Sequence, residues 1–170
     1  MANAIIVKTR VQAENIDALN RNAKASADMP NGKAVTLAWS ATEGDEVFTA
    51  TAATTGLEFA IGRKEDLIVA TGSILESEKY DAWLLEVTSN SGVWLAVNPE
   101  VNKLIIGKVY AGLDARLFTN VAGEPFSVIY LEKGDIIQVS KDFFYASKSP
   151  ADVTGATAVE LTSNGFEATV

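Results

Sequence analysis

Histidine and cysteine are both absent from the 170 residues of this chain. Without histidine there is no Ser-His-Asp triad and no Cys-His pair, and the commonest zinc ligand is missing. Without cysteine there is no thiolate nucleophile, no iron–sulfur cluster and no disulfide bond. We therefore predict that the chain is not an enzyme and has no catalytic, cofactor or metal site, although oxygen ligands would still allow a calcium ion.

Long apolar runs are absent as well. The longest cover about five residues, as at 93–97, whereas a membrane-spanning helix needs about 20. The Ile5-Ile6-Val7 run is too short for a secretory signal, and Lys8 and Arg10 follow it instead of preceding it. We expect a soluble protein, made in a cytoplasm, with no membrane partner.

Basic side chains are outnumbered by acidic ones, 14 to 22, which leaves a net charge of −8. Because phosphate contacts need clustered Lys and Arg, no nucleic-acid partner is expected. The imbalance is uneven along the chain. Residues 1–33 carry five basic and three acidic side chains, and no basic residue follows Lys148.

The length suits one domain, or one domain with an arm. We divide it into an N-terminal arm (1–32), a β domain (33–148) and a C-terminal polar segment with a β-hairpin (149–170). In the arm, Ile16, Leu19 and Ala23 have helical spacing, which predicts a short helix over 12–22, and 5–7 could add one strand. The arm either packs on its own domain or extends over a neighbouring subunit, with disorder as a third alternative.

From residue 31 onward, alternating side chains and turn signals predict an all-β, mainly antiparallel fold, either a β-sandwich or a barrel. Residues 83–88 and 93–97 are expected to form a hairpin across the four-residue turn 89–92. The other predicted strands are 35–40, 47–52, 57–61, 67–71, 103–109, 126–131, 135–140 and 143–145, followed by a hairpin of 159–162 with 166–170.

The three Trp residues differ in their neighbours. Trp39 and Trp83 alternate in phase with aliphatic residues, which predicts that both lie in the core. Trp94 lies on the opposite face from Val93 and Leu95, so we expect it at a surface or an interface. The alternative for Trp94 is a second buried sheet face.

The acidic clusters give weak functional signals. Glu43, Asp45 and Glu46 surround Gly44 without the ligand spacing of a calcium loop, so a solvated turn is expected. Glu76, Glu78 and Asp81 would suit glycoside chemistry only at a defined carboxylate separation, which the sequence does not provide. Residues 133–137 indicate a turn at the start of a strand, and 31–33 lack the pattern of a phosphate loop.

Several stretches of the chain are similar to small virion structural proteins of tailed bacteriophages. They are WLAVNPEV at 94–101, FTN at 118–120, GEPF at 123–126 and GDIIQV at 134–139, together with residues 1–10 and 16–19. The resemblance implies a head-associated protein, either a capsid decoration protein or a minor capsid component. It brings no catalytic residues with it, and residues 54–80 match nothing in that family.

The resemblance implies that the partners are the major capsid protein and further copies of this chain, which places the protein on the capsid surface of a virion. The predicted interaction residues are Lys8, Arg10, Arg21, Lys24 and Trp94. The alternatives are a carbohydrate-binding module that uses Trp94, a structural module of the tail or baseplate, and an enzyme that uses only Asp and Glu.

Overall fold

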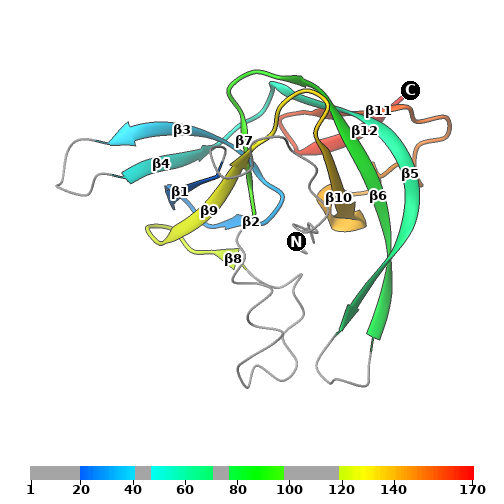
Figure 1. Ribbon diagram of the computed structural model, residues 1–170, viewed down its shortest axis with the longest axis horizontal. Helices are drawn as coiled ribbons and strands as arrows, with labels where there is room; N and C mark the ends of the chain where they lie inside the picture. The colour runs from blue at the N-terminus through cyan, green and yellow to red at the C-terminus, as the bar shows by residue number, and fades with distance from the viewer. Residues whose placement is uncertain (1–19, 41–46, 71–76, 98–118) are drawn as a thin grey trace.

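The computed structural model describes residues 20–40, 47–70, 77–97 and 119–170 (Figure 1). These residues form two β units, a closed barrel and an open sheet, and no strand belongs to both. Nine of the ten strand pairings among the described residues are antiparallel and one is parallel. The isolated bridge between Phe144 and Phe166 is also parallel. The predicted all-β, mainly antiparallel fold is confirmed, and the structure contains a barrel.

The barrel has five strands in the order β1, β4, β3, β7, β9, with β9 pairing back to β1. Its one parallel contact lies between β1 and β4. The bounds are β1 Asn20–Ala25, β3 Ala34–Ser40, β4 Val47–Ala52, β7 Trp94–Ala96 and β9 Pro125–Tyr130.

The second unit is a five-stranded sheet in the order β10, β6, β5, β11, β12. Its strands are β5 Leu57–Ala70, β6 Ser77–Asn90, β10 Ile136–Ser140, β11 Ala158–Leu161 and β12 Phe166–Thr169. A two-stranded ribbon, β2 Met29–Pro30 with β8 Thr119–Asn120, and a 3-10 turn, η3 Lys141–Phe143, complete the described elements. The predicted strand at 143–145 is wrong, since Phe144 makes only an isolated bridge to Phe166.

The hairpin predicted for 83–88 with 93–97 does not form. β6 pairs with β5 and β10 in the sheet, whereas β7 pairs with β3 and β9 in the barrel. The chain passes from the sheet to the barrel between β6 and β7, and the Asn90 side chain stabilises this segment. Its Nδ2 donates to the Leu131 carbonyl and its Oδ1 accepts from the Val93 N–H. Two adjacent strands with a turn between them therefore end in different units.

Two hydrophobic cores explain why β7 is apolar on both faces. Trp94 and Ala96 face the barrel interior, in a cluster with Val35, Ala50 and Val128. Leu95 faces the other way, into a larger cluster that includes residues of both the barrel wall and the sheet. That larger core contains Ala34, Val93, Val97 and Ile129 from the barrel side and Phe59, Trp83, Leu85, Ile137 and Phe166 from the sheet side. The barrel and the sheet thus share one core.

β5 is a single strand of 14 residues, although the sequence predicted two short strands at 57–61 and 67–71. The register with β6 shifts between Ile61 and Lys64, so an irregularity replaces the predicted break. Gly62 lies at this shift, where a Cβ atom would come within 2.9 Å of the Leu84 carbonyl oxygen. A glycine there lets the two backbones approach closely enough for the pairing to continue past the bulge.

Part of the predicted N-terminal arm belongs to the barrel. Asn20–Ala25 form β1, and Ala23 and Ala25 are buried in the barrel core. The predicted helix over 12–22 is therefore wrong at residues 20–22, because pairing with β9 and β4 satisfies the backbone that a helix would have used. Residues 12–19, the predicted strand 5–7 and the predicted strand 103–109 lie outside the described residues.

The C-terminal hairpin is confirmed as β11 and β12, and it is part of the sheet because β11 also pairs with β5. The turn predicted at 133–137 is confirmed too. The Glu132 N–H donates to Asp135 Oδ2 at 2.8 Å, and β10 begins at Ile136.

Candidate interaction surface

One end of the barrel carries a concentration of aromatic side chains. Inside the barrel, interior positions alternate with outward ones along each strand. The middle of the interior is filled by small or β-branched residues, namely Ala23, Ala50, Val35 and Val128. Moving toward one end along each strand, the next interior positions are Arg21 on β1, Phe48 on β4, Leu37 and Trp39 on β3, Trp94 on β7 and Tyr130 on β9. We call these six residues the aromatic end.

The strand directions place these residues at the same end. β1, β4 and β7 run one way and have Arg21, Phe48 and Trp94 toward their N-terminal sides. β3 and β9 run the other way and have Trp39 and Tyr130 toward their C-terminal sides. Residues far apart in the sequence therefore gather around one opening of the barrel.

The aromatic rings contact one another in two pairs. Trp39 packs edge-on against Phe48 with ring centroids 5.0 Å apart, and Trp94 packs at a tilt against Tyr130 with centroids 5.2 Å apart. Trp39 is 53% exposed, and Phe48, Trp94 and Tyr130 are half-buried. Partly buried rings held by neighbouring rings form a rigid, apolar surface that loses little conformational entropy on binding.

The opposite end of the barrel is closed. Ala25, Ala96, Phe126 and Met29 are all buried there. Asn120 joins β8 to β2, since its Nδ2 donates to the Met29 carbonyl at 3.2 Å and to Asn31 Oδ1 at 3.1 Å. The barrel therefore has one end sealed by its own chain and one end that presents aromatic rings to solvent.

Trp39 is the main residue that the sequence analysis misplaced. It was predicted to lie in the core because it alternates with Val35 and Leu37, and that alternation is real. β3, however, pairs with β7 only through Ala34 and Val35, so its last residues extend past the neighbouring strand. Side-chain alternation shows which residues of a strand face the barrel interior, but it does not show how far the neighbouring strand extends. Only the short pairing of β7 with β3 shows that Trp39, Phe48 and Tyr130 lie at an open end of the barrel.

The predicted interaction residues are distributed differently from the prediction. Trp94 and Arg21 both lie at the aromatic end, where Trp94 is half-buried and Arg21 is exposed. Lys24 alternates with the buried Ala23 and Ala25, so it lies on the outer face of β1. Lys8 and Arg10 lie outside the described residues. The structure thus brings together two of the five predicted residues.

Charge is segregated between the two units. The described barrel and ribbon residues (20–40, 47–53, 93–97 and 119–131) include three basic and two acidic residues. The described sheet residues (54–70, 77–92 and 132–170) include six basic and twelve acidic residues. Among the described residues, the acidic side chains are therefore concentrated in the sheet, which does not contain the aromatic end.

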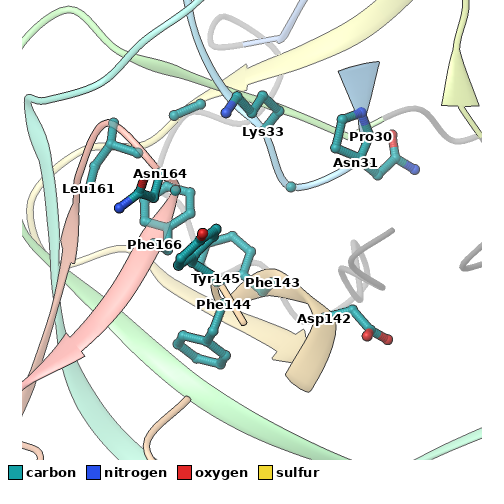
Figure 2. Close-up of a pocket in the computed structure, with 13 residues that line it drawn as sticks. Pro30, Asn31, Lys33, Asp142, Phe143, Phe144, Tyr145, Leu161, Asn164 and Phe166 are labelled. Carbon is teal, nitrogen blue, oxygen red and sulfur yellow. The ribbon is translucent and has the colours of Figure 1, made fainter. Parts of the chain in front are cut away.

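A small cavity lies where the barrel and the sheet meet, between the β2–β3 turn and the segment after β10 (Figure 2). Its volume is about 80 Å³, which is small beside the several hundred Å³ of typical ligand pockets. Phe143, Tyr145 and Phe166 line it on one side and Pro30 and Lys33 on the other, while the Asp142 carboxylate points away from the rings (Figure 2). A cavity of this size is typical of a packing gap between the barrel and the sheet and is too small for an ordinary ligand.

Several acidic residues of the described chain make structural contacts. Asp81 forms a salt bridge with Lys64 at 2.8 Å, whereas Glu76 and the 43–46 cluster lie outside the described residues. The Ser149 hydroxyl donates to Asp152 at 2.5 Å and, with the Lys141 ammonium at 3.4 Å, lowers the pKa of the Asp152 carboxyl. Among the described residues no group of three or more His, Cys, Asp or Glu side chains could hold a metal ion.

Within the described ranges, no helix is long and apolar enough to cross a membrane. No protein-family model, curated protein or solved structure matches this chain.

Proposed function

We propose that this chain is a structural protein of a tailed-bacteriophage head, which binds the assembled capsid shell through the aromatic end of its barrel. The observation that carries the proposal is the gathering of two Trp, one Tyr, one Phe and one Arg around a single opening. Trp, Tyr and Arg are the residues most enriched at binding hot spots between proteins. The similarity of 94–101 and 123–126 to virion proteins supplies the partner, the major capsid protein.

The charge distribution supports this orientation. Among the described residues, acidic side chains are concentrated in the sheet unit, which carries twelve acidic and six basic residues. A protein that attaches by its barrel would direct the acidic sheet toward solvent, and like-charged outer surfaces keep particles from adhering to one another. An acidic patch on the shell would be attracted to Arg21.

Co-sedimentation tests the proposal. Purified chain is mixed with capsid shells assembled without it, and the bound fraction is measured after pelleting. We expect binding at micromolar concentration, and a weakening of about thirtyfold for Trp39→Ala, which corresponds to a hot spot of about 2 kcal/mol. Val121→Ala is the matched control, because Val121 is 54% exposed at a position outside the aromatic end.

A chain that stays in the supernatant, or a Trp39→Ala variant that binds as tightly as wild type, contradicts the proposal. Immunolabelling in the electron microscope separates a head position from a tail or baseplate position.

Carbohydrate binding is the second candidate, because the exposed Trp39 ring would also stack on a sugar face. A screen of glycans with the wild-type chain tests it directly. The head proposal predicts no glycan whose binding depends on Trp39, and such a glycan would favour the carbohydrate-binding module.

A further inference from the structure

Along one edge of β3, residues 36–40 pair with no strand that the structure describes. Its other edge pairs with β4 at every position from Val35 to Ser40. On the β7 side, the pairing stops after Val35. Along 36–40 the β7-side edge has no strand partner in the described part of the chain.

This edge lacks the features that protect exposed strands. Natural proteins usually block free edges with charged residues, proline or bulges, which prevent strands of other molecules from pairing. β3 has the sequence AVTLAWS and β4 the sequence VFTATA, so neither strand contains a charged residue or proline. β3 also pairs with β4 without a register shift. A regular, uncharged edge of this kind is suited to accept another strand.

We propose that the β3 edge pairs antiparallel with the β3 edge of a second copy of this chain, about a two-fold axis at Ala38. The edge is self-complementary in that register. Leu37 would lie opposite Trp39 of the second copy on one face, and Thr36 would lie opposite Ser40 on the other. An aliphatic residue opposite an aromatic one, and two hydroxyl residues opposite each other, are favourable cross-strand pairs.

The register centred on Ala38 also uses the free edge best. Five residues on each strand, 36–40, would be paired, and this is the full length that β7 leaves open. A centre at Leu37 would require Val35, whose edge already pairs with Trp94. Because the residue at the axis faces its own copy, Ala38, which is exposed, would meet Ala38 without a clash of charges or large side chains.

This pairing explains the exposure of Trp39. In one copy the Trp39 ring packs on Phe48 and remains 53% exposed. In the paired state, Leu37 of the second copy would cover part of that ring, and the two copies would form a continuous sheet in the order β4, β3, β3, β4. The inference does not depend on shell binding, because the pairing is expected in the purified protein.

A single introduced cysteine tests the register, since the natural chain has none. Directly opposite residues in antiparallel strands have Cα atoms about 4.5–5.5 Å apart, within the range of about 4.4–6.8 Å that a disulfide requires. Ala38→Cys should therefore form a disulfide-linked dimer under mild oxidation. Ala122→Cys is the control, because Ala122 is also exposed but lies in a turn away from β3.

We expect the Ala38→Cys dimer to form at least about tenfold faster than the Ala122→Cys dimer, because paired strands hold the two thiols in bonding position. Equal rates would overturn the proposed register. Sedimentation velocity of the unmodified chain is the second measurement, and it should show a dimer that Trp39→Lys dissociates and Val121→Lys does not. A monomer at all concentrations would overturn the proposal, and circular dichroism verifies that each variant is folded.

Discussion

Leu95→Ala tests the conclusion that the barrel and the sheet share one core. Leu95 is fully buried on β7, and its neighbours in the barrel wall are Ala34 on one side and Ile129 on the other. All three belong to the core that lies against the sheet. Truncating Leu95 removes buried methyl groups and leaves a cavity between two rigid β layers.

The expected cost follows from this setting. Leu→Ala substitutions in cores cost about 2–5 kcal/mol, and the cost rises when the surroundings cannot collapse into the space. Ala34 is too small to fill the cavity, and strand pairing on both sides of β7 restrains the backbone. We therefore expect a loss of about 3–4 kcal/mol in the free energy of unfolding, a large part of the 5–15 kcal/mol that is typical of folded proteins.

Urea unfolding measures this loss. With a typical slope of about 2–3 kcal/mol per molar urea for a chain of this size, the midpoint should fall by about 1–2 M. Tryptophan fluorescence and far-ultraviolet circular dichroism should give coincident transitions, because the shared core couples the two units. Leu95→Met, which conserves volume, should cost less than about 1.5 kcal/mol. A loss below about 1 kcal/mol for Leu95→Ala, or separate transitions for the two probes, would refute the shared core.

Three further predictions concern individual contacts. Asn120→Ala should cost about 2–4 kcal/mol in urea unfolding, because it leaves the Met29 carbonyl and Asn31 Oδ1 without the donor they now share, and an unchanged midpoint would contradict this. Deleting residues 1–25 should abolish the cooperative transition, because β1 makes five register pairs with β9 and three with β4, and a transition that survives the deletion would contradict this. Asp152→Asn should lower the free energy of unfolding at neutral pH, because Ser149 and Lys141 stabilise the Asp152 carboxylate of the folded protein. The difference from wild type should disappear as the pH falls from the ordinary Asp pKa of 3.8 through the lowered pKa of the folded protein. Below that pKa the carboxyl group is protonated in both the folded and the unfolded protein. A difference in stability that persists in acid would exclude this linkage.

Local patterns in the sequence correctly predicted strands where each strand has one distinct apolar face. The strands 35–40 and 47–52 and the hairpin of 159–162 with 166–170 were predicted in this way, and they are confirmed as β3, β4 and the β11–β12 hairpin. Trp83 was predicted to be buried, and it is 3% exposed and packs edge-on against Phe144. In these cases the alternation and the turn residues carry all the information required, because the partner strand is the next one in the chain.

The prediction failed where the partner of a strand is distant in the sequence. The run at 93–97 is apolar on both faces because β7 separates two cores, and this same feature made it look like the partner of 83–88. β1 was assigned to an arm because Asn20 and Asn22 obscure the two buried alanines, Ala23 and Ala25. Neither pattern shows which strand will supply the neighbouring backbone.

The amino-acid sequence alone determined that this protein is built from β-strands and that it carries a strong negative charge. It also excluded catalysis and metal binding by histidine or cysteine side chains. The tertiary structure alone decided which apolar residues are buried and which are displayed. Trp39 and Val35 occupy equivalent positions in the alternation of β3, yet Val35 is fully buried and Trp39 is not. The reason is that β7 pairs with β3 only as far as Val35, and the length of that pairing is set by long-range contacts that no local pattern encodes.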